Sequence, residues 1–351
     1  MMHPALPRKT VADGKASCRA AIAHRHWLHA RIGIAAALFC IQLGHAQELP
    51  SELAGPQALI GESHAFAVPA MDSQRRSGRQ HAEAQGDFLV RQRTLGIMIG
   101  NSLAVALYGK QNWWQDGFNS RLRAVNEGWF GQQTYSGGAD KLGHFFMNYA
   151  STRLFSRAFE WSGNDADQSL RLAAWLTFGT FTAVEILDGF SKKWRFSKED
   201  VIMNAAGVGT AFLLERNPAL DRVLDLRLLY RPSRANDGGF DPFGDYSGQT
   251  YLFVVKASGI SALSNHPWLR YAEVAVGYGT RGYSGAAAVG NDQRSRNVYA
   301  GVSLNLSELL NGTVFRDSTE ERRAQRLTNT FLEFVQVPGT AALESHRLRA
   351  D

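Results

Sequence analysis

The sequence predicts an α+β protein: a helical bundle core at about residues 94–230, followed by an antiparallel β-rich part at about residues 250–338. In the first region, apolar residues recur at helical spacing in successive segments. After Pro232 the pattern changes, and every second residue is apolar in segments that glycine-rich turns separate. The helical pattern therefore precedes the strand pattern along the chain, and this order gives the fold class.

Residues 1–46 have the pattern of a secretory signal peptide. Six lysine and arginine residues, with one acid, precede an apolar core at Ile32–Leu43. A small-residue site at 44–46 follows, which predicts cleavage after Ala46. The apolar core is shorter than the roughly 20 residues of a membrane span, so cleavage is favoured over the alternative of a retained anchor. We therefore expect an exported protein of the periplasm.

Charge and cysteine content exclude several classes of function. The formal net charge is +6, but most of the excess lies in the presequence, so the mature chain lacks the basic surface of a nucleic-acid-binding protein. Both cysteines, Cys18 and Cys40, also lie there. The mature chain therefore has no disulfide, no thiolate nucleophile and no cysteine metal site.

The helical part is expected at residues 94–232, after a polar leader or linker at 47–93. Its first helix is predicted at Thr94–Leu107, where the sequence is compact and apolar. Three further helices are predicted at Leu142–Phe159, Leu170–Leu187 and Lys198–Glu215. Ser197 is placed to cap the last of these, with Asp200 three residues later as in a capping box.

The central helices also indicate membrane association. The apolar stretches Leu172–Val184 and Val201–Leu214 are nearer 13 or 14 residues than 20, which fits buried or interfacial helices. The alternative is that Leu170–Leu187 spans the membrane, with Glu185 paired inside a bundle. We favour membrane association and leave the number of spans open.

The C-terminal part is expected to contain strands. A turn-rich linker at 233–249 precedes a β-rich region at 250–338, and residues 339–351 form a tail. Three strand faces are predicted from alternation, and Phe331–Val337 is a candidate last strand. The faces are Tyr251, Phe253 and Val255; Ala272, Val274, Val276 and Tyr278; and Val298, Ala300, Val302, Leu304 and Leu306. The charged run Arg316–Arg326 is interpreted as a solvated helix face.

Polar residues interrupt the apolar faces of three predicted helices. Asp140 and His144 are four residues apart, as are Asp200 and Asn204, while Glu185 and Asp188 are three apart, so each pair shares one helix face. If the helices pack as a bundle, these side chains converge. The candidate polar cluster is Asp140, Lys141, His144, Glu185, Asp188, Ser197, Asp200 and Asn204.

Clustered buried carboxylates need compensation by a cation, hydrogen bonds or shared protons. A divalent metal held by His144, Glu185, Asp188 and Asp200 is one hypothesis. The alternative is structural. In that reading Asp140 and Asp200 cap helices, Glu185 pairs with Lys141 or Arg153, and Asn204 satisfies backbone groups beside Gly207.

The motifs around these residues resemble those of a known family. DKLGHF, EILDGFSKKWRFSKED and NAAG, in this order, resemble the YfiM-like family of periplasmic proteins, which has no assigned function. NWW at 112–114, FGDYSGQTY at 243–251, PWLRYAEVAVGYG at 267–279 and FLEFVQVP at 331–338 resemble the pattern of its larger members. The resemblance covers roughly residues 110–338. Small members are lipoproteins, but here Phe39 precedes Cys40, where a lipobox has a small residue.

The helical motifs also resemble, over a shorter stretch, the VanZ-like membrane family, which implies a membrane context. On either resemblance the corresponding positions are the eight polar residues above and Gly207. Neither family supplies a catalytic mechanism for them.

Together these observations favour a cell-envelope protein that is not an enzyme. Its helical core would pack at a membrane, and its β-rich part would bind a partner or the outer membrane. The alternative is a metal-assisted hydrolase or transferase acting on lipid or a cell-wall precursor, with His144 as general base. Neither G-x-S-x-G nor H-E-x-x-H occurs, so no motif places a nucleophile or a zinc site.

Overall fold

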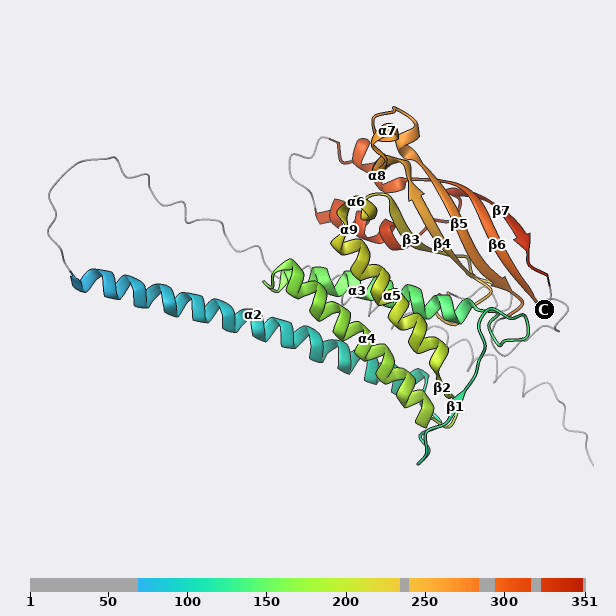
Figure 1. Cartoon of the computed structure of the whole chain (residues 1–351), viewed down its shortest axis with the longest axis horizontal. Helices are drawn as coiled ribbons and strands as arrows, with labels where there is room; N and C mark the ends of the chain where they lie inside the picture. Colours follow the sequence, from blue (N-terminus) through green and yellow to red (C-terminus); the bar gives the residue numbers. More distant parts are fainter. Residues whose placement is uncertain (1–68, 234–239, 284–293, 317–322, 350–351) are drawn as a thin grey trace, which may run out of the picture.

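The computed structural model describes residues 69–233, 240–283, 294–316 and 323–349, with side chains from Ala84 onward. Helices come first and an antiparallel sheet follows, so the predicted α+β class is confirmed (Figure 1). The predicted signal peptide, both cysteines and the first part of the polar leader lie outside the described residues. So do residues 234–239 of the turn-rich linker and residues 317–322 of the charged run.

Long helices make up the N-terminal part: α2 (Pro69–Asn112), α3 (Ala139–Trp161), α4 (Ala166–Phe190) and α5 (Lys198–Arg216). The three predicted central helices correspond to α3, α4 and α5. Helix α5 begins after Ser197, whose hydroxyl accepts a hydrogen bond from the backbone N–H of Asp200, as the capping pattern predicted. Asp165 caps α4 in the same way, through the N–H of Gln168. A short helix, α6 (Pro218–Asp221), follows α5.

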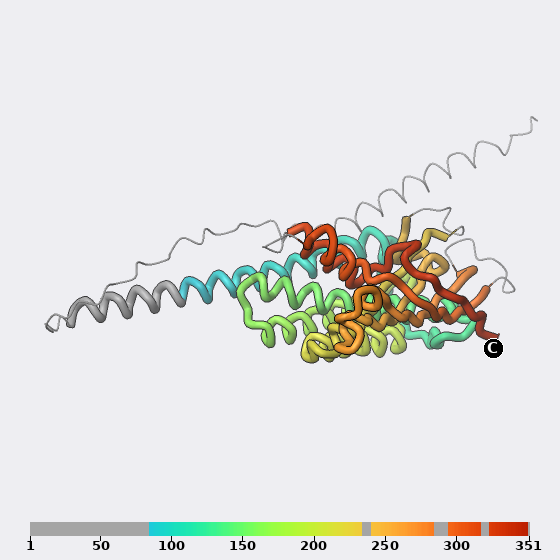
Figure 2. Tube along the Cα trace, turned by 90° about the horizontal axis from the view of Figure 1, so that it is seen from above, coloured from blue at the N-terminus to red at the C-terminus, as the bar shows by residue number. Residues whose placement is uncertain are grey.

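Helix α2 is longer than the sequence suggested. It begins at Pro69, so the second half of the leader predicted at 47–93 is helical rather than a linker. This stretch is rich in Ala, Gln and Arg, which favour helices but provide no apolar face, and its composition therefore resembles that of a linker. The N-terminal half of α2 extends beyond the other helices (Figure 1), and its C-terminal half lies along the helical layer (Figure 2).

Helix α3 is the centre of the helical layer. Its Phe159 packs with Ala173 of α4 and Ile97 of α2. Helices α3 and α5 run in the same direction and cross closely at Gly207, where a Cβ atom would collide with the backbone carbonyl of Phe145. This close crossing brings the first turns of α3 and α5 together, next to the last turn of the antiparallel α4.

The C-terminal part contains a five-stranded sheet in the order β3-β4-β5-β6-β7, with all neighbours antiparallel. Its strands are β3 (Leu224–Tyr230), β4 (Gln249–Lys256), β5 (Ala272–Arg281), β6 (Ser295–Leu304) and β7 (Ala341–Arg347). The three predicted strand faces lie on β4, β5 and β6. Only Leu306 departs from them, since it begins helix α8 (Leu306–Gly312).

Two strands lie where the sequence did not predict them. Strand β3 lies in the segment assigned to the helical part, because its alternating sequence places Asp225 and Arg227 on the buried side, where an apolar residue is expected. Strand β7 lies in the predicted tail 339–351. It is an edge strand with mostly exposed, polar residues, so it has little apolar alternation.

The last strand predicted, Phe331–Val337, is wrong. Residues Arg323–Phe334 form helix α9, and only Val335 makes an isolated bridge, to Leu228. Leu327, Phe331, Phe334 and Val335 recur at the i, i+4, i+7, i+8 spacing of a helix face. Taken alone, the segment 331–337 also fits the alternation of a strand.

Short elements complete the fold. Strands β1 (Ala124–Val125) and β2 (Phe196–Ser197) pair in parallel and tie the segment before α3 to the beginning of α5. Between β4 and β5 lie the single turns η3 (Ala257–Gly259), α7 (Ser261–Ser264) and η4 (Leu269–Tyr271).

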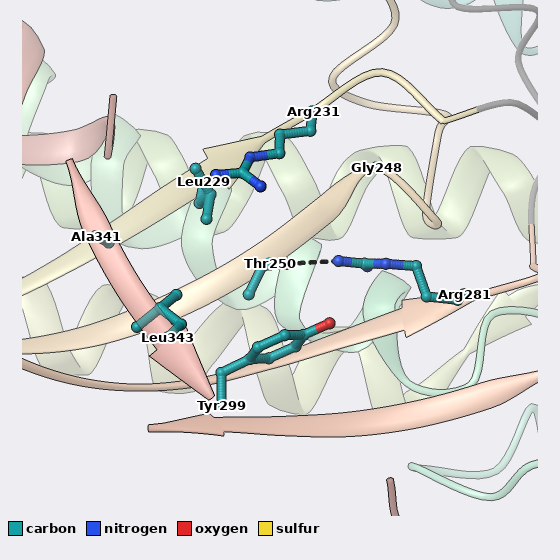
Figure 3. Close-up of a pocket in the computed structure, with 8 residues that line it drawn as sticks. All are labelled: Leu229, Arg231, Gly248, Thr250, Arg281, Tyr299, Ala341 and Leu343. Carbon is teal, nitrogen blue, oxygen red and sulfur yellow. Dashed lines mark hydrogen bonds between the residues drawn. The ribbon is translucent and has the colours of Figure 1, made fainter. Parts of the chain in front are cut away.

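The sheet is curled, so that its two edge strands approach each other. Leu229 of β3 and Leu343 of β7 line the same cavity (Figure 3). The same inner face holds a buried ion network in which Arg227 pairs with Asp225 and Glu273. On the outer face, the β3 leucines and Tyr251 pack against the cluster of α3 and α5 residues, which joins the sheet to the helical layer.

Candidate metal centre

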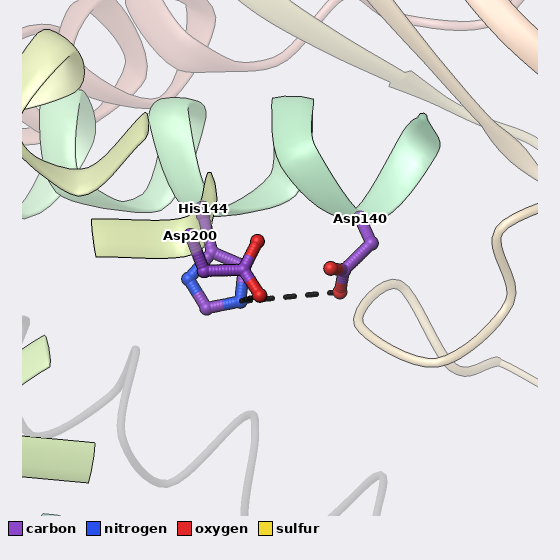
Figure 4. A group of neighbouring side chains, drawn as sticks. All are labelled: Asp140, His144 and Asp200. Atoms are coloured by element: carbon purple, nitrogen blue, oxygen red, sulfur yellow. Dashed lines mark ion pairs between the residues drawn. The ribbon is translucent and has the colours of Figure 1, made fainter. Parts of the chain in front are cut away.

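The predicted polar residues come from three helix ends that meet at one end of the helical layer. The first turns of α3 carry Asp140, Lys141 and His144, and those of α5 carry Asp200 and Asn204. The end of α4 carries Glu185 and Asp188. Figure 4 shows the side chains of Asp140, His144 and Asp200 directed toward one another.

His144 lies at the middle of this arrangement. Its Nε2 atom is 3.9 Å from Oδ1 of Asp140, 3.7 Å from Oε1 of Glu185 and 3.9 Å from Oδ2 of Asp200. Its Nδ1 atom is 3.0 Å from Oδ1 of Asn204, an acceptor, which assigns a proton to Nδ1. In the neutral imidazole the lone pair of Nε2 is therefore directed at three carboxylates.

This geometry suits a divalent cation. In a tetrahedral site with ligands about 2.1–2.3 Å from the ion, neighbouring ligand atoms are roughly 3.4–3.8 Å apart, close to the distances around Nε2. The ligand atoms of Asp140, His144 and Asp200 all lie within 4.8 Å of one another. The hydrogen bond from Nδ1 to Asn204 would hold the imidazole in the ligating orientation.

Lys141 pairs with the oxygens of Asp140 and Asp200 that do not face His144. Its Nζ atom is 2.6 Å from Oδ1 of Asp200 and 3.1 Å from Oδ2 of Asp140, and it also forms an ion pair with Glu127. Asp140 and Asp200 therefore each direct one oxygen toward Lys141 and the other toward His144. Lys141 is only 1% exposed, so this contact is among the most deeply buried ion pairs in the described chain.

Burial and neighbouring charges both shift the pKa values of the side chains in this cluster. Burial alone would lower the pKa of His144, but the carboxylates of Asp140, Asp200 and Glu185 outweigh it and raise that pKa. Burial raises the pKa of Glu185 to about 8 and that of Asp188 to about 6. Without a cation, the centre would therefore retain protons near neutral pH.

Asp188 and Ser197 lie near this cluster, but their side chains pair with groups other than His144. Oδ1 of Asp188 accepts a hydrogen bond of 2.6 Å from the indole N–H of Trp114. Ser197 caps α5, and its backbone N–H is 3.4 Å from Oε2 of Glu185. The metal hypothesis from the sequence named Asp188, whereas the side chains whose ligand atoms lie close together include Asp140 instead.

Parts of the structural alternative do not match the geometry. The N-cap position of α3 is Gly138, and no side chain caps it, so Asp140 is not the cap. Glu185 does not pair with Lys141 or Arg153, because Lys141 binds other acids and Arg153 pairs with Glu215, Asp221 and Glu333. The capping role of Ser197, with Asp200 in the first turn, does match.

Some contributing residues were not identified from the sequence. Glu127 pairs with Lys141, and the hydroxyl of Tyr246 donates to Oδ1 of Asp140 at 3.1 Å. Tyr246 lies in the FGDYSGQTY motif, but nothing in the motif indicated contact with α3. Trp114 lies in the NWW motif at 112–114, which did not indicate that its indole N–H would donate to Asp188.

Comparison with known proteins agrees with the expected cellular context. Residues 126–216 match the model of a family described as "Predicted periplasmic lipoprotein (DUF2279)". The matched stretch contains α3, α4 and α5, and with them the three carboxylates around His144, the imidazole itself and Lys141. The match covers less than half of the chain, and it supports an envelope protein. The match does not support the YfiM-like name or the similarity to VanZ-like proteins. Both remain resemblances between motifs.

No curated protein and no solved structure matches the chain.

Proposed function

We propose that this is a membrane-associated envelope protein whose helical layer holds a divalent cation and uses it to bind an anionic group of an envelope component. The observation that carries the proposal is the position of His144 Nε2, at 3.7–3.9 Å from carboxylate oxygens of three different residues. The ligand atoms of Asp140, His144 and Asp200 lie within 4.8 Å of one another, and Glu185 adds a further carboxylate oxygen beside Nε2. One imidazole nitrogen with carboxylate oxygens suits a divalent cation.

Membrane association is supported by the surface of α4. Among the described residues, α4 is the one helix long and apolar enough to cross a membrane, yet only 28% of its most apolar window is buried. Trp175 is 73% exposed, and Ile186 and Leu187 are also exposed. A core helix of a soluble protein would bury these side chains.

Helices α2 and α5 also expose apolar side chains. Exposed apolar residues recur every four positions along α2, and α5 exposes apolar residues near both of its ends. They are Leu95, Ile99, Leu103 and Leu107 on α2, and Ile202 and Leu213 on α5. Since three helices of one layer expose apolar side chains, a lipid surface is the partner that this layer fits best.

We propose association without complete crossing. The uncharged run of α4, residues 172–184, lies between Arg171 and Glu185 and is about 20 Å long at 1.5 Å per residue. A hydrocarbon core is about 30 Å thick. The centre lies at the Glu185 end of this run, where a lipid-associated helix would reach the headgroup level.

Flotation with liposomes tests the membrane part of the proposal. The purified full chain should float with vesicles of phosphatidylglycerol and phosphatidylethanolamine and remain bound in 1 M salt, because screening weakens only electrostatic attachment. Trp175→Glu combined with Leu187→Glu should reduce flotation, whereas Glu160→Gln, at an exposed polar position, should not. Wild-type protein that stays with the soluble fraction would reject membrane association.

A second candidate, the metal-assisted hydrolase, is favoured by access to the centre. The side chain of His144 is 21% exposed, so water and a substrate can approach the carboxylates. In hydrolysis of a phosphate ester, the water oxygen would bond to phosphorus and pass a proton to a carboxylate. The bond to the alcohol oxygen would break, and the alcohol would take up that proton.

Phosphate release from phosphatidic acid distinguishes the two candidates. The hydrolase predicts release that depends on Mg²⁺, Mn²⁺ or Zn²⁺ and disappears in His144→Ala. Binding of the metal with no release above background, in all three metals, leaves the binding function alone.

A further inference from the structure

The inner face of the curled sheet contains a cavity of about 120 Å³ (Figure 3). One part of its wall is apolar: Leu229 from β3, Ala341 and Leu343 from β7, and the ring of Tyr299 from β6. These side chains come from both edges of the sheet, so the cavity exists only because the sheet curls. It is separate from the cluster of His144, and none of the residues of that centre lines it.

The rest of the wall is cationic. The guanidinium groups of Arg231 and Arg281 lie at the cavity with the hydroxyl of Thr250 (Figure 3). Arg281 is held in place, because its Nη1 donates to the carbonyl of Thr280 at 2.7 Å and its Nη2 to Oγ1 of Thr250 at 3.4 Å. Its Cζ atom lies 5.8 Å from the centre of the Tyr299 ring.

Neither arginine has an acidic partner among the described residues. The ion pairs of the sheet involve Arg227, Lys256 and Arg270, while Arg231 and Arg281 form none. Since both arginines line the cavity, an anion bound there would have charged hydrogen-bond donors from two strand ends. The planar guanidinium fork matches a carboxylate in particular, which it can bind through two parallel hydrogen bonds.

We infer that this cavity binds a small carboxylate with a short aliphatic chain. The carboxylate would lie between Arg231 and Arg281, and the chain would lie against Leu229, Ala341 and Leu343. The volume limits the chain to roughly four or five carbons, since a cavity of about 150 Å³ accommodates benzene. The site is distinct from the proposed cation centre in place, in charge and in ligand.

Calorimetric titration of the full-length, detergent-purified protein with pentanoate tests the inference. We expect saturable binding, and a loss of affinity of about tenfold or more in both Arg231→Gln and Arg281→Gln, since each removes a charged hydrogen-bond donor. Arg222→Gln is the matched control, because this arginine is exposed and lies outside the cavity. Leu343→Trp should abolish binding by filling the apolar part.

The competing outcomes are distinct. If 1-pentanol binds as tightly as pentanoate, the arginines do not recognise the ligand and the inference is wrong. If inorganic phosphate binds more tightly than pentanoate and Leu343→Trp leaves that binding intact, the cavity is an anion site without an aliphatic part, which also overturns the inference. His144→Ala should leave pentanoate binding unchanged, so failure of the cation proposal is separable from failure of this one.

Discussion

The ammonium nitrogen of Lys141 lies 2.6 Å from Oδ1 of Asp200, and both side chains are buried. The lysine is therefore the fixed positive charge of a centre that otherwise contains carboxylates and one imidazole. Breaking a buried ion pair by removing one partner costs about 3–5 kcal/mol, because the other charge stays buried without compensation.

Lys141→Met should accordingly lower the free energy of unfolding by about 3–5 kcal/mol, measured by denaturant titration in detergent. Lys198→Met is the control, because Lys198 is exposed at the beginning of α5. Equal stability of the two variants would mean that Lys141 does not stabilise the cluster.

Trp114→Phe should destabilise the protein through Asp188. The change removes the indole N–H that donates to Oδ1 of Asp188, which leaves a largely buried acceptor unpaired and costs about 1–3 kcal/mol. Trp175→Phe is the matched control, since Trp175 is exposed and makes no such bond. A loss of the same size in both variants would show that ring size, rather than the hydrogen bond, matters.

Gly207→Ala tests the close crossing of α3 and α5. The added Cβ would meet the backbone carbonyl of Phe145, so the helices must separate, at a cost of about 1–3 kcal/mol. Gly209→Ala, two residues along the same helix, has no atom within 4 Å of its new Cβ and should be neutral or slightly stabilising. Thermal unfolding of the pair decides this, and a tolerated Gly207→Ala would contradict the packing described.

Burial of Glu185 predicts a specific dependence on pH in metal-free protein. Its folded-state pKa is raised to about 8, so its contribution to stability is fully present below the unfolded value near 4.5 and is lost as pH rises through about 8. Glu185→Gln resembles the protonated acid at every pH. In EDTA, the variant should match wild type near pH 5 and have the higher Tm near pH 8. Parallel Tm curves over this range would contradict the shift.

The helix spacings predicted which polar residues share a helix face. Asp140 with His144, and Asp200 with Asn204, each lie one helical turn apart. The structure brings His144 close to Asp140, Glu185 and Asp200, whereas Asp188 pairs with Trp114. The order of helical and alternating segments likewise predicted the α+β class.

Features that depend on tertiary partners could not be predicted in this way. Glu127 and Tyr246 reach the centre from loops, where no periodicity indicates a direction. Strand β3 was missed because Asp225 and Arg227 are buried by pairing with other charges rather than by being apolar. The segment Phe331–Val337 fits both a helix face and a strand by its sequence, and in the structure α9 includes it only as far as Phe334.

Metal analysis of protein purified in detergent, after dialysis against trace divalent cations, tests the central claim most directly. We expect about one divalent cation per chain in wild type. The cation should be lost in His144→Ala, which removes the proposed ligand atom Nε2, and in Asp200→Asn, which removes a proposed carboxylate ligand. Asp116→Asn, at an exposed carboxylate away from the centre, should retain the metal. Wild-type protein that takes up no metal, or a His144→Ala variant that holds as much as wild type, would contradict the proposed centre.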